Sequence, residues 1–440
     1  MKYQSQKVAL YYFYGALVLF LVQILAGLLA GTVYVFPNLL SETLPFSHIK
    51  MIHTNALIVW LLMGFMGSTF YLLPEEAERD LHSPKMAIVQ FWLFLVGALL
   101  AVVGYLFGIH DGDKFLEQPI PIKLAIVVVC LMFLYNCTMT VIKGRKTAIA
   151  NILMVGLWLA VLLFLFAFVT PANIAIDKMY RWWVVHLWVE ATWELILASI
   201  LAFLMIKMTG VDREVIDKWL YIVISLTMFT GLLGTGHHYY WIGTPGYWQW
   251  IGSVFSALEI VPPFALVIFC FSMVWRGRRD HPNKAALLWA LGCSVLTFFG
   301  AGVWGFLHTL SPINYYTHGT QVTVSHGHLA FYGAYVMVNI AMFTYALPYL
   351  LERNPFNQRI NMWGFWVTSS AVVFMTVALT MAGVVQVQLQ RVMGMNYMEV
   401  QDQMQLFYHM RLGAGVFVLI GVVLILYSLM AVPARNKQAA

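Results

Sequence analysis

The residues best suited to chemistry are histidines and glutamates that fall inside long apolar segments. An ionisable side chain is costly in a bilayer unless something compensates, so such positions are informative. Of the 19 acidic residues, only Glu190, Glu194 and Glu259 fall well within these segments. Seven of the histidines there are His53, His186, His237, His238, His308, His326 and His328. Neutral imidazole is a common ligand of haem iron and other transition metals, so the set predicts a metal or haem site.

Two of these histidines stand two residues apart in the stretch SHGH, at His326 and His328. Successive residues of an α-helix turn by about 100°, so these side chains point roughly 200° apart. They cannot serve one metal ion together. They can serve two large planar cofactors on opposite sides of one helix, and we predict that this helix separates two haems.

The stretch HLWVEATWE places His186 and Glu190 one helical turn apart, with Glu194 one turn further along. A histidine and a glutamate at this spacing share one face of a helix and can chelate a divalent metal. The alternative is a simple hydrogen bond between the two side chains.

The doublet His237 and His238 follows Gly234 and Gly236. These glycines predict a loosened helix end, which would let adjacent imidazole rings converge. Together with His186 and Glu190, the doublet would form a mixed nitrogen and oxygen site, which suits iron better than copper(I).

The elements that carry these residues are expected to be membrane-spanning helices. The chain has 440 residues, of which 61% are hydrophobic and 10% charged, and a mean hydropathy of +0.78. These values indicate a polytopic, all-α membrane helix bundle, and we expect one membrane-embedded domain over residues 1–440. Apolar runs long enough to span a bilayer occur at 8–36, 51–73, 86–108, 120–142, 148–169, 181–207, 218–240, 249–275, 285–310, 325–350, 360–389 and 406–432.

The cations predict the orientation of these twelve spans. The N-terminus, the even-numbered loops and the C-terminal tail hold 18 of the 25 Lys and Arg residues, including Arg353, Arg435 and Lys437. Positive loops face the cytoplasm, so both termini are predicted to be cytoplasmic. The net charge of +6 is thereby explained by topology and anionic lipid headgroups, and it does not indicate nucleic-acid binding.

With this topology the seven histidines lie at about one depth, near the outer face, on the second, sixth, seventh, ninth and tenth spans. A single histidine near a helix end is more often hydrogen-bonded than metal-bound. A cluster from several helices instead indicates a site built inside the bundle. His308 has no spacing partner, and we interpret it as a hydrogen-bonded histidine.

The four cysteines form no C-x-x-C motif, so the sequence predicts neither a disulfide framework nor a covalently attached haem. We expect buried structural thiols. Electrons for any redox reaction would therefore have to come from another protein.

With these residues in place, the chain resembles the haem-copper oxidase superfamily, most closely the large subunit of the cytochrome c-dependent bacterial nitric oxide reductases. The resemblance extends over nearly the whole chain. It is carried by KMIHTNALIVWLLMGFMG, RWWVVHLWVEATWELI, GVDREVIDKWLY, GTGHHYYWIGTPGYW, GSVFSALE and NYYTHGTQVTVSHGHLAFYGAY.

The resemblance implies the following roles. His53 and His328 would be the axial ligands of a low-spin haem b, and His326 the proximal ligand of a high-spin haem b. The non-haem iron ligands would be His186, His237, His238 and Glu190. Glu194 and Glu259 would be acids near the site that relay protons, since burial would favour their protonated form. Glu117, in KFLEQP, matches the position of a calcium ligand.

One residue separates this chain from the oxygen-reducing branch of the superfamily. Those oxidases usually have H-P-E-V-Y where this chain has H-L-W-V-E at residues 186–190. Glu190, a hard oxygen ligand, therefore stands in place of their redox-active tyrosine. A second, less decisive difference from the family is Lys50, which stands where the resemblance leads us to expect an arginine. We therefore predict reduction of two NO to N2O and water, in denitrification or NO detoxification.

Three other functions compete with this prediction. The nearest is a haem-copper oxygen reductase, which Glu190 disfavours. A polytopic transporter whose His and Glu line an ion path would bind no haem. A nitric-oxide-dismutating relative is the third.

The resemblance also implies a partner and a location. We expect a membrane-anchored c-type cytochrome subunit to dock on the outer face. The predicted location is the bacterial cytoplasmic (inner) membrane, with the active site toward the periplasm.

Overall fold

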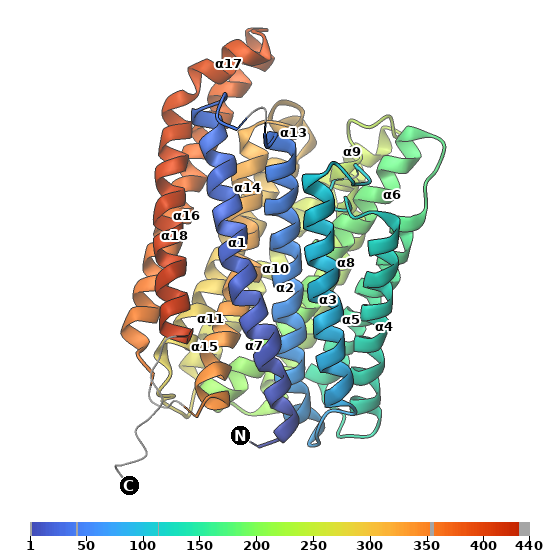
Figure 1. The fold of residues 1–440 in the computed structure, drawn as a ribbon, viewed down its shortest axis with the longest axis vertical. Helices are drawn as coiled ribbons and strands as arrows, with labels where there is room; N and C mark the ends of the chain where they lie inside the picture. The colour runs from blue at the N-terminus through green and yellow to red at the C-terminus, as the bar shows by residue number, and fades with distance from the viewer. Residues whose placement is uncertain (1, 41–42, 113, 353–355, 431–440) are drawn as a thin grey trace.

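The computed structural model is a bundle of long helices (Figure 1). It describes residues 2–40, 43–112, 114–352 and 356–430, and within these ranges it contains no strand. Twelve helical segments are long and apolar enough to cross a membrane, so the predicted number of spans is confirmed. All four cysteines are unpaired, as the sequence predicts.

The helices have the following bounds. They are α1 (Ala9–Val35), α2 (Phe46–Ala77), α3 (Pro84–Leu106), α4 (Ile120–Ile142), α5 (Ala148–Phe164), α6 (Ile174–Leu187), α7 (Trp193–Thr209), α8 (Arg213–Gly234), α9 (Tyr247–Leu258), α10 (Val261–Trp275), α11 (Lys284–Thr297), α12 (Gly305–Thr309), α13 (Ser311–Thr317), α14 (Gln321–Phe331), α15 (Met337–Leu350), α16 (Gln358–Gln386), α17 (Tyr397–Gln403) and α18 (Gln405–Met430).

Several spans contain short irregular segments. The 3₁₀ segments are η1 (Gln4–Val8), η2 (Leu165–Phe168) and η4 (Thr235–His238), and the π-helical segments are η3 (Trp188–Thr192), η5 (Phe298–Trp304), η6 (Tyr332–Val336) and η7 (Val387–Val392). Such π segments widen a helix locally and occur frequently at functional sites. Segments η3, η5 and η6 interrupt spans that carry candidate site residues. They therefore influence where the side chains of these spans point.

Some spans begin earlier than the apolar runs predict. The sixth span runs from Ile174 to Thr209 and the second from Phe46 to Ala77, whereas the predicted runs are 181–207 and 51–73. The extra turns contain polar residues that hydropathy does not detect. Side-chain caps fix several starts: Asn173 accepts hydrogen bonds from two backbone amides of α6, and Ser83 accepts one from Met86 in α3.

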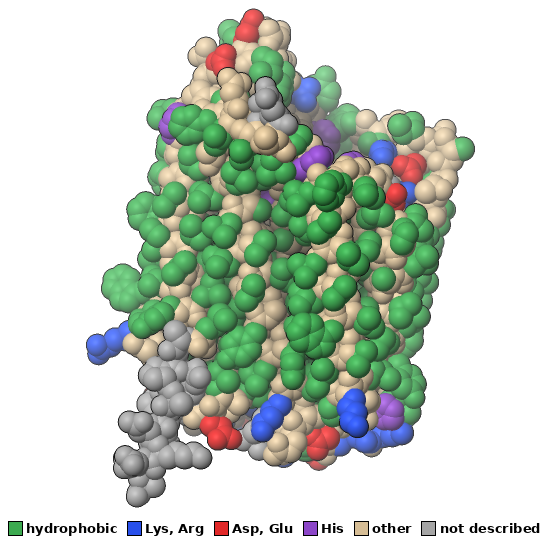
Figure 2. Space-filling view, viewed as in Figure 1, with side chains coloured by type: hydrophobic (Ala, Val, Ile, Leu, Met, Phe, Trp, Pro, Cys, Tyr) green, Lys and Arg blue, Asp and Glu red, His purple; other side chains and the backbone are tan. Residues whose placement is uncertain are grey.

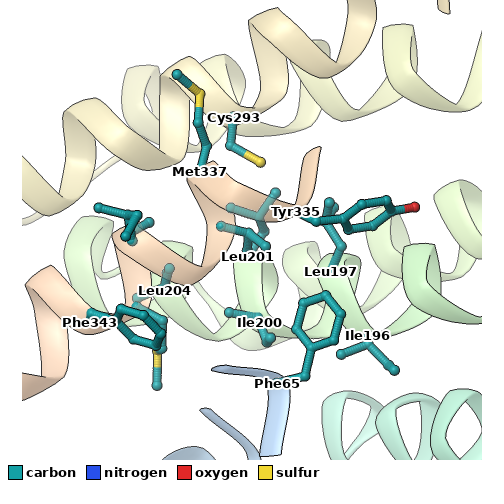
Figure 3. Close-up of a cluster of buried hydrophobic side chains, with 14 of the residues drawn as sticks. Phe65, Ile196, Leu197, Ile200, Leu201, Leu204, Cys293, Tyr335, Met337 and Phe343 are labelled. Atoms are coloured by element: carbon teal, nitrogen blue, oxygen red, sulfur yellow. The ribbon is translucent and has the colours of Figure 1, made fainter. Parts of the chain in front are cut away.

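Three spans are the most deeply buried in the bundle, namely α2, the α6–α7 span and the α14–α15 span. Their contacts form an apolar core. Figure 3 shows Phe65 of α2, Ile196 and Leu201 of α7, and Tyr335 of η6 packed together. The same three spans carry most of the candidate ligands, so the core holds the site rigidly.

Charged side chains lie at both ends of the bundle, whereas the apolar band between the ends contains few of them. α1 starts at the lower end in Figure 1, which we call the N-terminal end, and α2 starts at the opposite end. Figure 2 shows Lys and Arg side chains along the N-terminal end and several histidines toward the opposite end, with an apolar band between. Arg353, Arg435 and Lys437, which contribute to the predicted orientation, lie outside the described residues.

Close packing of α2 against α15 gives a stability prediction. A methyl group added at Gly64 would collide with Oδ1 of Asn339, which is fully buried. We expect Gly64→Ala to destabilise the protein by about 1–3 kcal/mol, because the buried amide cannot move aside freely. The check is the melting temperature of the purified protein in detergent.

Gly97→Ala is the matched control, because Gly97 of α3 has open space around it. It should leave the melting temperature unchanged or raise it slightly. Equal losses in the two variants would contradict the packing argument.

Candidate metal and cofactor site

A cavity of about 530 Å³ lies among the helices, and its walls include most of the candidate ligands. The candidate residues that line it are His53, Glu117, His186, Glu190, Glu194, His238, Glu259, His326 and His328. His237 lies directly behind the wall, with its ring centre 4.2 Å from that of His238. Residues from several spans, which the sequence places at one depth, are thus brought together.

His53 of α2 and His328 of α14 face each other across this cavity. Their ring centres are 6.4 Å apart and their planes differ by 23°. A metal–imidazole bond is about 2 Å long and a ring nitrogen lies about 1 Å from the ring centre, so two rings on one metal have centres roughly 6 Å apart. The pair therefore has the spacing of two axial ligands of one metal ion.

Hydrogen bonds fix which nitrogen of each ring is free. Nδ1 of His53 donates to the carbonyl oxygen of Gln23 (2.9 Å), and Nδ1 of His328 donates to that of Val324 (2.8 Å). Nδ1 of His326 donates in the same way to the carbonyl of Gly300 (3.1 Å). Each ring then carries its proton on Nδ1, which leaves the Nε2 lone pair for a metal.

The backbone around these histidines leaves room for a large group. A methyl group on Gly27 would lie 2.5 Å from Cε1 of His53, so only glycine lets α1 approach that ring. Gly327 lies between the two cavity-facing histidines of α14, and a methyl group there would meet nothing within 4 Å. His328 faces His53, whereas His326 faces Gly300, so the doublet does point to two different sides of the helix.

A second group of ligands gathers at another wall of the cavity. His186, Glu190, His237 and His238 each offer one ligand atom, and these four atoms lie within 4.8 Å of one another. Ligand atoms that share a metal with bonds of about 2.1 Å are at most about 4.2 Å apart, so small side-chain shifts would complete a shell. Among the described residues this is the only such group of three or more.

Irregular backbone brings this group together. Glu190 lies in the π segment η3 with φ −104° and ψ 16°, outside helical geometry. His237 and His238 end the 3₁₀ turn η4, which is the loosened helix end that Gly234 and Gly236 predict. The ring centres of His237 and His238 lie 5.0 and 5.3 Å from that of His186.

The hydrogen bonds of His186 favour a cation between it and Glu190. Nε2 of His186 donates to the carbonyl of Gly231 at 2.7 Å, which leaves a lone pair on Nδ1 of the neutral ring. That Nδ1 is buried without a hydrogen-bond partner and lies 3.5 Å from Oε1 of Glu190. Two acceptors facing each other repel, so a cation between them, either a proton on Nδ1 or a metal ion, resolves the arrangement.

The other two glutamates stand close to this group. Oε2 of Glu194 accepts a hydrogen bond from Thr227 at 3.1 Å. Glu259 places Oε1 3.8 Å from Nε2 of His186, and this oxygen is buried without a hydrogen-bond partner. A methyl group on Gly234 would collide with the same oxygen, so glycine is required beside that carboxyl.

Glu117 lies at another part of the cavity, and it is buried rather than exposed in a loop. Its Oε2 accepts a hydrogen bond from the amide of Asn55 at 3.0 Å. Lys50 and Lys114 line the same cavity. Two lysines against one carboxylate suit a ligand that carries its own carboxylates.

His308 does not belong to either group. Its Nδ1 pairs with the hydroxyl of Thr317 (2.8 Å) and its Nε2 with that of Thr323 (3.0 Å), so both ring nitrogens are occupied. This agrees with its interpretation as a hydrogen-bonded histidine.

Two cavity residues are missed by reasoning from the sequence. The ring of Trp182 stacks on His238 at 4.4 Å and 6°, one turn before His186 on the same helix. Arg411 lines the cavity from α18, with its guanidinium 4.8 Å from the ring centre of Tyr34. The signal in the sequence for Arg411 is its charge inside the predicted span 406–432, where a cation is costly.

Comparison with known proteins agrees with this geometry. Residues 7–417 match the family described as cytochrome c and quinol oxidase polypeptide I. The chain belongs to this family. It is also 53% identical to the B subunit of nitric oxide reductase from Stutzerimonas stutzeri, in an alignment that covers 97% of this chain and 95% of that protein.

Two further comparisons give much lower sequence identity. The Cbb3-type cytochrome c oxidase subunit CcoN1 of Stutzerimonas stutzeri is 23% identical over 78% of this chain and 75% of that protein. A cryo-EM structure of a heme-copper terminal oxidase dimer superposes with a TM-score of 0.77 at 15% identity, covering 100% of this chain and 86% of that chain. The latter similarity supports the fold alone.

The four-residue ligand group gives a prediction about metal content. If these four residues bind a metal, Glu190→Ala should reduce the transition metal bound per chain by about one ion, because it removes one of the four candidate ligands and the only carboxylate among them. Elemental analysis of the purified protein measures this. The matched control is Glu214→Ala, at an exposed glutamate of α8 that pairs with Lys218. An unchanged metal content in Glu190→Ala would show that Glu190 is not a ligand.

Proposed function

We propose that this chain is the catalytic subunit of a nitric oxide reductase, which converts two NO, two electrons and two protons into N2O and water. The observation that carries the proposal is the carboxylate of Glu190 beside three histidines at the cavity wall. A carboxylate in this position gives a hard ligand set, which favours iron. The 53% identity to the B subunit of a nitric oxide reductase supports the same reaction.

The proposed cofactors are two b-type haems and one non-haem iron. His53 and His328 would hold the low-spin haem, and His326 the high-spin haem. The non-haem iron would be held by His186, Glu190, His237 and His238. The free Nε2 atoms, the 6.4 Å ring separation and the open space at Gly327 support this assignment. When bound, the iron centres supply the redox chemistry and the sites for NO.

Glu194 and Glu259 are the proposed proton donors. Both line the cavity, and both stand beside the ligand group. A protonated carboxyl can give its proton to the oxygen that leaves as water and can stabilise negative charge that develops during N–N bond formation. Thr227 orients the carboxyl of Glu194 through its hydroxyl, whereas Oε1 of Glu259 is left free to exchange a proton.

The second candidate function is oxygen reduction, as in the oxidases of the same family. The matches to cytochrome c oxidase subunits, at 21% and 23% identity, indicate only that this chain and those oxidases share a fold. Glu190 stands where such an enzyme would need a phenol, which argues against it.

Electrons would come from a membrane-anchored c-type cytochrome subunit. This part of the proposal rests on the identity to a protein named as one subunit of a reductase, and no C-x-x-C-H motif occurs in the sequence. The expected location is the bacterial inner membrane, with the histidine cavity toward the periplasm. The cations at the N-terminal end support this orientation.

Glu117 is the proposed calcium ligand. Calcium takes six to eight oxygen ligands. Glu117 would supply one carboxylate, and carboxylates of the bound haems and water would supply others. Lys50 and Lys114 would hold the remaining haem carboxylates.

The function is tested by product analysis and metal counting on the purified complex. We expect two NO consumed for each N2O formed, and one iron in addition to the two b haems, with no copper. One copper per two haems, with oxygen consumption in place of NO consumption, would return the protein to the oxygen reductases.

The tight contact at Gly27 gives a spectroscopic prediction. Gly27→Ala should displace His53, since the added methyl group would lie 2.5 Å from the imidazole. The low-spin haem should then become high-spin or be lost from the protein. Visible absorption and electron paramagnetic resonance measure the spin state. Gly31→Ala, one turn along α1, is the control, because its nearest neighbour would be 3.8 Å away. If both variants keep the low-spin signal, His53 is not an axial ligand.

A further inference from the structure

A second cavity, of about 290 Å³, lies at the N-terminal end of the bundle, away from the histidine ligands. Its walls come from the N-terminal segment, α2, α7, α15 and the loop between α10 and α11. Its volume is close to the lower limit of small-molecule sites, about 300 Å³. NO reduction as proposed above makes no use of it.

The charges that line this pocket are predominantly positive. Lys2, Lys207 and Arg279 line it, and the only carboxylate among the described lining residues is Glu75. Glu75 is already satisfied, because it pairs with the ammonium of Lys207 and accepts a hydrogen bond from Gln6 at 3.0 Å. Within the described part of the chain, the charges of Lys2 and Arg279 are therefore left without a counter-ion in the pocket.

Arg279 differs in this respect from its neighbour in the same loop. Its Nη1 donates to the backbone carbonyl of Lys207 at 3.1 Å, and it makes no ion pair with any residue that the structure describes. Arg278 pairs with Asp212 at 3.2 Å and does not line the pocket. The backbone hydrogen bond holds the Arg279 guanidinium at the pocket wall and leaves further N–H donors for a ligand.

Neutral donors complete the lining. The backbone amide of Asn283 donates to Nδ1 of His281 at 3.1 Å, so the proton of this imidazole is on Nε2. Burial, and the nearby charge of Arg279, lower the pKa of His281, so the ring is neutral at neutral pH. Nε2 then donates to the hydroxyl oxygen of Tyr349 at 3.2 Å. The Tyr349 proton is thereby directed away from His281 and is available inside the pocket.

We propose that this pocket binds a phosphate-bearing anion, either the headgroup of an anionic phospholipid or free phosphate. Guanidinium, ammonium and hydroxyl donors around one small cavity match the oxygens of a phosphate group. The pocket also lies at the end of the bundle where the cations of the chain gather. Basic pockets between membrane helices at the cytoplasmic leaflet bind phosphate headgroups of this kind.

The test is isothermal titration calorimetry on the purified complex in a neutral detergent. Three probes are titrated: inorganic phosphate, short-chain phosphatidylglycerol and short-chain phosphatidylcholine. If phosphatidylglycerol binds and inorganic phosphate does not, the pocket is a lipid headgroup site. If inorganic phosphate binds, the free ion suffices. The proposal is overturned if neither phosphatidylglycerol nor inorganic phosphate binds. It is also overturned if the two lipids bind equally well while inorganic phosphate does not bind.

Variants locate the binding in this pocket. R279Q should weaken the binding of whichever probe binds by about tenfold or more, the cost of losing one charge-assisted contact. R279K should retain most of the affinity, and R278Q should change it less than about twofold, because Arg278 does not line the pocket. If R278Q weakens binding as much as R279Q, or if the K2Q/R279Q variant binds like the unaltered protein, the proposal is wrong.

The outcome is independent of the reaction at the histidine cavity. The haem spectra and NO turnover of R279Q in detergent should match those of the unaltered protein. Absence of NO reduction by the unaltered protein would refute the proposed function without bearing on anion binding.

Discussion

Inside a bilayer, a polar group has no water to bind, so every hydrogen bond must be made within the protein. The candidate site depends on this constraint. The imidazoles of His53, His326 and His328 each donate through Nδ1 to a backbone carbonyl, and this bond sets the tautomer and the direction of the other nitrogen. The ligand geometry is therefore held by the same backbone that forms the bundle.

Irregular helix segments extend this principle to the second ligand group. Glu190 reaches the three histidines from a π segment, and His237 and His238 converge at a 3₁₀ turn. Adjacent side chains point about 100° apart on an α-helix and about 120° apart on a 3₁₀ turn, so the 4.2 Å between these two ring centres follows from the end of the helix and the side-chain conformations. The four candidate ligands thus gather where one span is interrupted at Glu190 and another ends at His238.

The bundle also separates its chemistry along its length. Candidate ligands and buried acids line one cavity, Lys2 and Arg279 line a second pocket at the N-terminal end, and an apolar band lies between the two ends of the bundle. The two cavities share no described lining residue. The deeply buried α2, α6–α7 and α14–α15 spans run between the two ends.

The sequence by itself determined the number of spans, the depth of the histidines and the angles between ligands on one helix, because hydrophobic length and the turn per residue are local properties. It did not determine where spans begin when their first turns are polar, as at Ile174. The tertiary structure alone decided the facing of His53 with His328, the stacking of Trp182 on His238 and the placing of Arg279 in a pocket. Distances between residues on different helices depend on how the helices pack, and no local pattern encodes that packing.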